Sequence, residues 1–500
     1  MDTFANLMMG FGVAVTLQNL MYCFIGVFVG TLIGVLPGIG PLGTIAMLLP
    51  LTFNVPPVAA LIMLSGIYYG AQYGGSTTAI LVNLPGETSA VVTCIDGYQM
   101  ARRGRAGPAL AIAAIGSFIA GTFGTLMIAV AGPPLAEFAL KFGAPEYFSL
   151  MLMSLVAAAV LAQGDMLKSI AMVALGLLLG LVGTDVNTGT QRYSFDVAEL
   201  SDGIGFIVVA VGIFAIGEIV ANLDDSEERV VFTDKIKNLF PSWDDLKVSF
   251  MPIMRGTAIG SFFGVLPGTG PAIASFAAYM LEKKISKTPE RFGHGAIEGV
   301  AAPEAANNAD AQCKFIPMLT LGLPASGVMA LMLGALTMQG IQPGPEVMTQ
   351  RPELFWGLIA SMWIGNLMLV ILNLPLVGLW VKLLSVPYRM LFPAIMAFSA
   401  IGVYSVNNSA FEIYLTALFG VLGFIWAKLG FNMTPMLLGF VLGPMMEEHL
   451  RRAMLMSRAD PTVFVTRPLS LVFIIATVLI LLVVLLPAFR KNRSEITAGG

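Results

Sequence analysis

The sequence predicts an all-α polytopic membrane protein with about 12 transmembrane segments, in two inverted repeats with Gly/Pro-broken helices or re-entrant hairpins. Three observations carry this prediction: the composition, a series of long apolar stretches, and a helix-breaking phrase that occurs twice. Of the 500 residues, 57% are hydrophobic and only 11% are charged, and the mean hydropathy is +0.83. Soluble domains carry about 25% charged residues, so this composition excludes an ordinary soluble protein.

Apolar stretches recur along the whole chain. A helix needs roughly 20 residues to cross a hydrocarbon core of ~30 Å. Because the N-terminus has neither a basic region nor a small-residue cleavage site, we expect the first stretch to be a retained span. The apolar stretches are 13–36, 57–82, 109–131, 147–184, 204–221, 315–338, 354–381, 391–446 and 469–487.

Polarity along the chain predicts four parts. The first membrane repeat is expected at residues 1–221 and the second at 251–468. A polar linker at 222–250 joins them, because its residues carry charges of both signs and divide the chain almost in half. A final transmembrane helix and a basic tail occupy 469–500.

The helix-breaking phrase marks the repeat. GTLIGVLPGIGP at residues 30–41 recurs as GSFFGVLPGTGP at residues 260–271, with eight of the twelve positions identical. A second similarity follows in the same order, since NLPGETSA from Asn83 aligns with GLPASGVM from Gly322. Each half therefore contains two Leu-Pro breaks, which indicates an internal duplication.

Loop charges predict that the two repeats have opposite orientations. The loop at 281–291 is rich in Lys and Arg, whereas its counterpart at 51–57 has no charge. After the second break the asymmetry is reversed, because 101–105 carries three arginines and 338–345 carries none. Short loops rich in Lys and Arg stay in the cytoplasm, so equivalent loops are expected on opposite sides of the membrane.

The repeated phrase also predicts where a ligand binds. Pro lacks the N–H that a helix needs and Gly frees the backbone, so L-P-G-x-G-P ends a helix. In a bilayer such a break survives only inside protein or beside a water-filled cavity, where the helix N-termini suit an anion. Paired breaks in two halves indicate the binding site of a secondary transporter, although Gly and Pro could instead only kink two packed spans. The candidate substrate-binding residues at the breaks are Pro37, Gly38, Gly40, Pro267, Gly268, Thr269 and Gly270.

Polar residues inside apolar stretches of the first half suggest an ion site. Such residues normally face a bundle interior or an aqueous path. Their oxygens could ligate Na⁺, or their hydroxyls could serve only to join helices. This possible Na⁺ site lies near Ser76, Thr77, Thr78 and Asn83.

In the second half, Asn307 and Asn308 adjoin Glu304 and are predicted to bind substrate. Lys314 follows Asp310 by four residues, so the two could neutralise each other on a helix. If Lys314 faces the cavity instead, it is a counter-charge for an acidic substrate, and we include it among the candidate substrate-binding residues. Four acidic residues are expected near membrane ends and receive no role: Glu87, Asp96, Glu218 and Glu447.

Other function classes leave weaker signals. The three cysteines and two histidines are scattered, so no metal centre or cofactor is predicted. No G-x-x-x-x-G-K-[ST] phosphate loop occurs, which disfavours a transport ATPase. A membrane-embedded enzyme stays open as an alternative, but no nucleophile–base spacing is visible. A standalone carboxylate carrier or channel without a binding protein is a further alternative.

The sequence resembles one family, the tripartite tricarboxylate transporter large membrane subunit (TctA family). The similar segments span nearly the whole chain and include GVLPGIGP, YGGSTTAILVNLPGE, GVLPGTGP and EGVAAPEAANNADAQCKFIPMLTLGLPAS. The resemblance implies a permease of the bacterial inner membrane, not an enzyme, that imports citrate-like carboxylates with a Na⁺ or H⁺ gradient. It also implies two partners, a small membrane subunit (TctB-like) and a periplasmic substrate-binding protein (TctC-like).

One departure from the family pattern concerns the substrate. After ANNA the family favours small residues, whereas this chain has Asp310, Gln312, Cys313 and Lys314. What the resemblance implies therefore stops at an organic anion, with a carboxylate expected.

Overall fold

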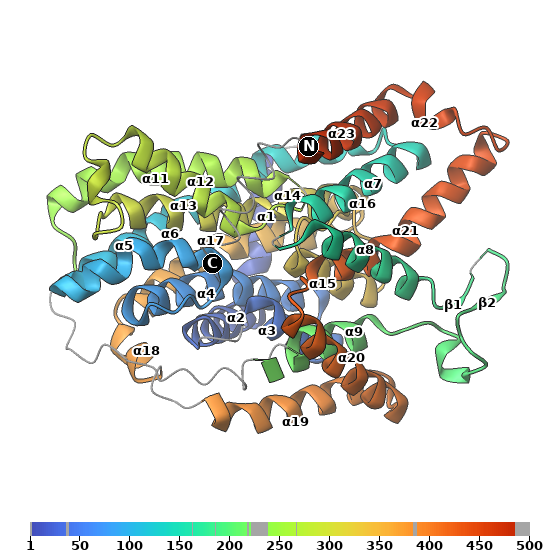
Figure 1. Cartoon of the computed structure of the whole chain (residues 1–500), viewed down its shortest axis with the longest axis horizontal. Coiled ribbons are helices and arrows are strands. Elements are labelled where there is room, and N and C mark those ends of the chain that lie inside the picture. Colours follow the sequence, from blue (N-terminus) through green and yellow to red (C-terminus); the bar gives the residue numbers. More distant parts are fainter. Residues whose placement is uncertain are drawn as a thin grey trace.

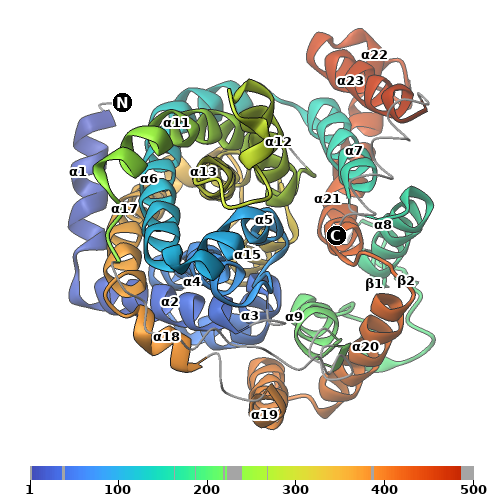
Figure 2. The same ribbon diagram turned by 60° about the vertical axis from the view of Figure 1, so that its left-hand side comes forward.

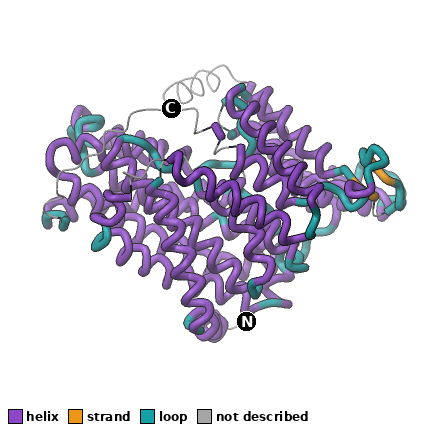
Figure 3. The backbone as a smooth tube through the Cα atoms, turned by 90° about the horizontal axis from the view of Figure 1, so that it is seen from below, coloured by secondary structure: helices purple, strands orange, loops and turns teal. Residues whose placement is uncertain are grey.

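The computed structural model describes residues 3–36, 40–162, 164–185, 187–217, 220–221, 239–266, 268–383 and 388–485, and it is almost entirely helical (Figure 1). Within these residues, strands occur only in one two-stranded hairpin at one end of the molecule (Figure 3). Six described helices are long and apolar enough to cross a membrane, and seven shorter apolar helices accompany them. The predicted all-α polytopic membrane fold is therefore confirmed.

The elements of the first half alternate long helices with short breaks. They are α1 (Thr3–Ala14), α2 (Leu17–Val35), α3 (Pro41–Leu48), the 3-10 helix η1 (Leu49–Asn54), α4 (Pro57–Val82), η2 (Thr88–Ala90), α5 (Val91–Met100), η3 (Ala101–Arg105), α6 (Ala106–Ala139), α7 (Ala144–Leu161), α8 (Met166–Gly180), β1 (Gly183–Thr184), β2 (Gln191–Arg192), η4 (Ala198–Leu200), α9 (Phe206–Ala210) and the π-helix η5 (Val211–Gly217).

The second half repeats this alternation. Its elements are α11 (Trp243–Val265), α12 (Pro271–Ile285), η6 (Pro289–Arg291), α13 (Glu298–Cys313), α14 (Phe315–Leu321), α15 (Gly327–Met338), α16 (Glu346–Gln350), α17 (Pro352–Asn373), α18 (Val377–Leu383), α19 (Tyr388–Asn407), α20 (Ala410–Lys428), α21 (Thr434–Met456), α22 (Val463–Thr466) and α23 (Pro468–Leu485).

The predicted linker at 222–250 differs from the structure at its end. Residues 222–238 lie outside the described part of the chain. α11 begins at Trp243 because Ser242 forms a capping box: its hydroxyl accepts the N–H of Asp245, and the Asp245 carboxylate accepts the N–H of Ser242. The last residues assigned to the linker are therefore helical.

The helices form two groups, which Figure 2 shows side by side. In the larger group, named here the core bundle (α1–α6 and α11–α18), α13 packs against α4, α5, α6, α11 and α12. The smaller group, the outer bundle, contains α7–α9, η5 and α20–α23, in which α8 packs on α21 and α20 packs on η5. The residues of α13 from Gly299 to Cys313 are all buried, and charged and amide side chains are among them.

The packing is reciprocal, as an internal repeat predicts. α2 packs on α4 as α11 packs on α13, and α6 packs on α13 as α17 packs on α4. In the outer bundle the contact of α8 with α21 is matched by that of α20 with η5. Each of these pairs thus has a counterpart when the two halves are exchanged.

Glycines let the paired helices approach to backbone contact. A Cβ added at Gly30 of α2 would lie 2.5 Å from the carbonyl oxygen of Ile67 in α4, and one at Gly260 of α11 would lie 2.1 Å from that of Ala306 in α13. Small residues at four-residue spacing permit such close crossings in membranes. The two stripes are Gly26, Gly30 and Gly34 in α2, and Gly256, Gly260 and Gly264 in α11.

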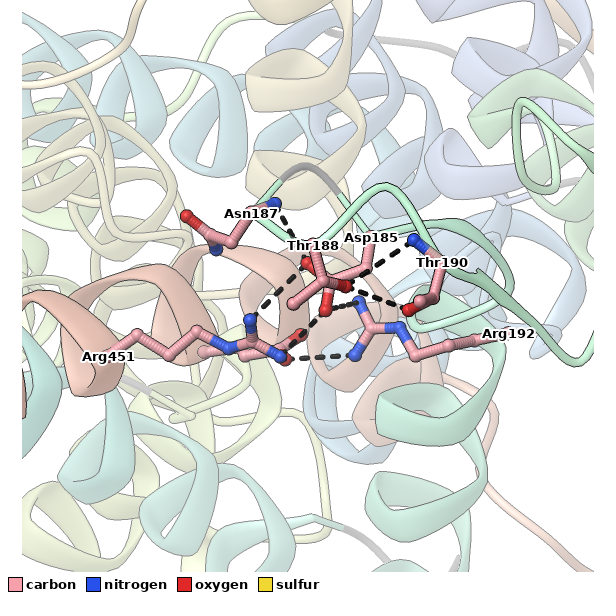
Figure 4. A network of polar contacts seen from close by, with 7 residues as sticks. Asp185, Asn187, Thr188, Thr190, Arg192 and Arg451 are labelled. Carbon is pink, nitrogen blue, oxygen red and sulfur yellow. Dashed lines mark hydrogen bonds and ion pairs between the residues drawn. The ribbon is translucent and has the colours of Figure 1, made fainter.

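The β1–β2 hairpin is anchored to the end of α21. Figure 4 shows Asp185 beside the guanidinium groups of Arg192 and Arg451, and the Arg451–Asp185 ion pair measures 2.9 Å. Glu447 on α21 accepts from both arginines, at 2.9 Å from Arg192 and 2.6 Å from Arg451. The N–H of Asn187, followed by Arg451, lowers the pKa of Asp185 to about 2. The charged side chains thus tie the loop between α8 and α9 to α21.

Candidate functional site

The two copies of the repeated phrase break their helices in the same way. α2 ends at Val35 and α3 starts at Pro41, while α11 ends at Val265 and α12 starts at Pro271. The N-cap residues Gly40 (φ −76°, ψ 168°) and Gly270 (φ −83°, ψ 153°) are both extended. Pro at the first helical position suits a helix start, because the N–H it lacks has no partner there.

The second pair of breaks also shares one backbone path. Asn83 (φ 59°, ψ 26°) and Gly322 (φ 69°, ψ 23°) end α4 and α14 in the left-handed conformation. Glu87 (φ −151°, ψ 166°) and Ser326 (φ −154°, ψ 171°) then occupy the N-caps of η2 and α15. The Leu-Pro breaks recognised in the sequence are therefore equivalent in three dimensions.

All four breaks line one cavity of ≈ 790 Å³. The N–H of Gly268 donates to the carbonyl oxygen of Ala325 at 3.1 Å, which joins the two breaks of the second half. The opposite wall comes from the outer bundle, so the cavity lies between the two bundles. The lining segments are 40–42, 85–88, 268–271 and 325–328 from the core bundle, with 213–214 and 430–435 from the outer bundle.

Helix N-termini, and no described basic side chains, lie at the cavity wall. The N-termini of α3, α12, α15 and η2 with α5 all reach it, and helix N-termini carry the positive end of the helix dipole. None of its described lining residues is Lys or Arg, and Glu87 is the acidic one among them. Backbone N–H groups and dipoles are therefore the available partners for an anion.

Gln72 on α4 adds a polar side chain that sequence reasoning missed. It is fully buried and lines the cavity, and its amide oxygen accepts from Ser89 at 3.3 Å. Its amide nitrogen Nε2 has no hydrogen-bond partner. A buried, unpaired donor at the cavity wall is suited to a ligand's oxygen. An amide inside an apolar helix was the available signal for it.

The two adjacent asparagines point in different directions. Asn307 donates to Glu87 at 3.0 Å, and its own oxygen Oδ1 is buried and has no hydrogen-bond partner. Asn308 donates to Ser117 on α6 at 2.7 Å and to the carbonyl oxygen of Glu304 at 3.1 Å. Asn307 thus contacts the cavity-lining residue Glu87, whereas Asn308 joins α13 to α6.

The predicted break residues reach the cavity as far as the structure describes them. Gly40, Gly268 and Gly270 line it. Thr269 lines it too, but its hydroxyl already donates to the carbonyl oxygens of Phe263 (2.6 Å) and Leu266 (2.8 Å) at the end of α11. Three further predicted residues, Pro37, Gly38 and Pro267, lie outside the described residues.

Comparison with known proteins decides the family. The model of the tripartite tricarboxylate transporter TctA family matches residues 20–438. The chain belongs to the TctA family. It is 58% identical over 496 residues to an Agrobacterium vitis protein described as "Uncharacterized 52.8 kDa protein in TAR-I ttuC' 3'region", covering 99% of both chains. A second Agrobacterium vitis protein, "Uncharacterized protein in TAR-II ttuC' 3'region", is 59% identical over 237 residues, which is 47% of this chain and 98% of that one. No solved structure matches the chain.

Lys314, at the point where this TctA chain departs from the family pattern, does not line the cavity. Its ammonium group pairs with the carboxylate of Asp310, and both side chains are fully buried. An unpaired charge in this apolar interior would be strongly unfavourable, so the two charges neutralise each other. Of the two predicted arrangements, the structure contains the ion pair, and the cavity-facing arrangement is not observed.

The four residues of the possible Na⁺ site do not converge. Ser76 and Thr77 line a small cavity of ≈ 10 Å³ beside Ser117, and Ser76 donates to the Glu304 carboxylate at 2.5 Å. Thr78 instead donates to the carbonyl oxygen of Val35 at 2.9 Å, and Asn83 is exposed at the end of α4. In this TctA chain the hydroxyls of Ser76 and Thr78 join α4 to other helices, as in the alternative interpretation, whereas the Thr77 hydroxyl donates to the carbonyl oxygen of Tyr73 in the same helix.

Two acidic residues that received no role lie inside the protein. Glu87 lines the cavity, and Asp96 on α5 is fully buried. Asp96 accepts the N–H groups of Gly293, Gly295 and Ala296 at 2.7 to 2.9 Å. Both carboxylates thus have partners within the protein, and their expected position near membrane ends stays a prediction. Glu218 lies outside the described residues.

Proposed function

We propose that this chain is the large permease subunit of a binding-protein-dependent secondary transporter. It imports an organic carboxylate, citrate-like or tricarboxylate-like, across the bacterial inner membrane, driven by a Na⁺ or H⁺ gradient. Its partners are a small membrane subunit (TctB-like) and a periplasmic substrate-binding protein (TctC-like). Membership of the TctA family supports the transporter class and the partners.

The convergence of four helix N-termini on one cavity is the observation that carries the proposal. Carboxylates bind well to free backbone N–H groups at helix N-termini. The unpaired amide nitrogen of Gln72 offers a further donor. Small-molecule pockets usually measure about 300–1,000 Å³, so ≈ 790 Å³ is ample for a carboxylate of citrate size.

The position of the cavity suggests how access alternates. The breaks form one wall in the core bundle, and the outer bundle forms the other wall. Movement of one bundle against the other would open the cavity to either side of the membrane, as in transporters with broken helices. The same geometry fits an elevator-like or a rocking motion.

Gly270 offers the sharpest test of the site. A Cβ added at Gly270 meets nothing within 4 Å, so Gly270→Leu places a side chain in open space without disturbing the N-cap. Gly268 is unsuitable, because its φ is +79° and an added Cβ would lie 2.6 Å from the backbone nitrogen of Ala158. Gly12 also has nothing within 4 Å, so Gly12→Leu is the matched control.

The experiment measures uptake of labelled citrate and a panel of other di- and tricarboxylates into vesicles containing the chain and its partners, with and without a Na⁺ or H⁺ gradient. Gly270→Leu should abolish uptake at normal membrane insertion, while Gly12→Leu should transport normally. Full transport by Gly270→Leu would refute this cavity as the binding site. Uptake that persists without the binding protein would favour the standalone carrier or channel.

A further inference from the structure

Glu87 breaks the symmetry of the cavity. It occupies the N-cap of η2, and its counterpart at the N-cap of α15, with the same backbone conformation, is the neutral Ser326. Both residues line the cavity. An ionised carboxylate at this wall would repel an organic anion that the surrounding helix N-termini attract. A cavity for an anion would gain from two neutral caps, so the acidic one calls for an explanation.

The surroundings of Glu87 are rich in oxygen atoms. Its carboxylate accepts from the hydroxyl of Ser89 and from Asn307 Nδ2. Asn307 Oδ1 is buried and lacks a partner, and the amide oxygen of Gln72 lies 3.3 Å from the Ser89 hydroxyl. Carboxylate, hydroxyl and amide oxygens are the ligands that hard cations prefer. The site could thus receive either a proton on the carboxylate or a small cation among these oxygens.

Among the residues that the structure describes, no basic side chain forms an ion pair with Glu87. The titratable groups acting on it are Tyr68 on α4, and Glu304, Asp310 and Lys314 on α13. The ammonium group of Lys314 is already paired with Asp310. Glu304 receives only hydroxyl hydrogen bonds among its described side-chain contacts, from Ser76 and Thr93. Within the described part of the chain, the helix N-termini therefore supply only partial charges near Glu87, and a mobile cation would supply a full positive charge when an anion arrives.

We propose that Glu87 is the residue at which the co-transported cation, H⁺ or Na⁺, is taken up, so that the cation and the organic anion occupy the cavity together. This inference rests on the proposed function. A proton would bond to a carboxylate oxygen and leave from the same oxygen on the cytoplasmic side. A Na⁺ ion would lie among the oxygens of Glu87, Ser89 and Asn307.

The test compares Glu87→Gln with wild type in vesicles that contain the partner proteins. Glu87→Gln keeps the shape of the side chain but cannot carry a negative charge at any pH. In wild type a cation gradient should stimulate citrate uptake at least about tenfold, since neutralising a like charge near a bound anion has effects of this size or larger. In Glu87→Gln the ratio of citrate uptake with the cation gradient to uptake without it should fall to about one. Exchange of internal for external carboxylate should continue. Glu353→Gln, an exposed change at the start of α17, should behave as wild type.

The gradients distinguish the two cations. A pH gradient without Na⁺ drives wild-type uptake if the cation is H⁺, and a Na⁺ gradient at equal pH drives it if the cation is Na⁺. If uptake by Glu87→Gln depends on the cation gradient as strongly as uptake by wild type, the inference is overturned and the proposed function stays intact. If no carboxylate of the panel is taken up by wild type, the proposed function itself fails. If Glu87→Gln does not reach the membrane, Glu87→Asp is tested in its place. The inference then requires a weaker apparent affinity for the cation in Glu87→Asp. An unchanged affinity would equally overturn the inference.

Discussion

At the scale of single residues, the chemistry of the cavity depends on side chains whose polar atoms have lost water. Gln72 is one of them, since its Nε2 is buried without a partner. Such an atom costs free energy in the empty protein and recovers it when a ligand oxygen arrives. It is therefore a place where folding stability and substrate affinity are opposed.

The first prediction follows from this opposition. Gln72→Leu removes the unpaired donor and should raise the KM for carboxylate uptake about tenfold. A hydrogen bond to a charged group contributes roughly 1.5–3 kcal/mol, and other donors in the cavity offset part of its loss. Protein amount and melting temperature should stay the same or rise. Gln350→Leu, on an exposed residue at the end of α16, is the control. An unchanged KM in Gln72→Leu would show that Gln72 does not contact the substrate.

Asp96 gives a second prediction, about stability. One oxygen, Oδ1, accepts three backbone N–H groups from the loop before α13, and Tyr279 donates to the other oxygen at 2.9 Å. Asp96→Ala leaves two buried donors, Ala296 and Tyr279, and two partly buried ones without partners, and should lower the free energy of unfolding by about 3 kcal/mol. The melting temperature of the purified subunit in detergent measures this loss. Asp202→Ala, on an exposed loop residue, should leave it unchanged.

Individual roles were harder to predict than the break positions, for a physical reason. Every residue of α13 from Gly299 to Cys313 is buried, so the helix has no polar face from which a direction could be inferred. Only the structure places Asn308 toward α6 and Lys314 against Asp310. The i, i+4 spacing did make the ion pair one of the two arrangements predicted from the sequence.

At the scale of elements, the glycine stripes set the distance between paired helices. Gly260→Ala would place a Cβ 2.1 Å from the carbonyl oxygen of Ala306. The helices must separate, so the third prediction is a loss of at least about 2 kcal/mol in the free energy of unfolding. Thermal melting in detergent checks it. Gly12→Ala adds the same methyl group to α1 where nothing lies within 4 Å, and it should have no effect.

The hairpin anchor gives a prediction about pH. The pKa of Asp185 is lowered to about 2 in the folded protein, against about 4 for a free aspartate. A lowered pKa means that the ionised form stabilises the anchor above pH ~4, and that this stabilisation disappears as the pH falls from ~4 to ~2. Amide hydrogen exchange, corrected for intrinsic rates, should show the loop at 183–203 losing protection in this window. Arg451→Gln should lose the same protection already at pH 7.

The breaks show how far sequence reasoning extends at this scale. Pro and Gly act locally, so the ends of α2 and α11 could be predicted from the repeated phrase alone. That four breaks meet at one cavity depends on packing between helices far apart in the chain, such as α4 with α17 and α6 with α13. Local patterns carry no signal for such packing. The duplication nevertheless supplied a reason to expect that equivalent breaks would be near each other.

At the scale of the whole molecule, the cavity is a boundary between two bundles. Its two walls belong to different bundles, and each bundle contains elements from both halves of the chain. The helix pairs α2–α4 and α11–α13, and α8–α21 and α20–η5, correspond when the halves are exchanged. In the proposed transporter, such a symmetry would allow two equivalent states with opposite access.

This picture yields a last prediction, that fixing the two bundles to each other stops transport. An added Cβ at Gly327 of α15 would lie 3.2 Å from Thr434 Cγ2 of α21, across the boundary and at the cavity wall. Cysteines at both positions, in a background without Cys23, Cys94 and Cys313, are within reach of a disulfide. Oxidation should abolish carboxylate uptake and reduction should restore it, while each single cysteine variant transports under both conditions. If the cross-linked protein transports at the normal rate, the substrate must pass without relative motion of the bundles at this point, and a channel becomes the better description.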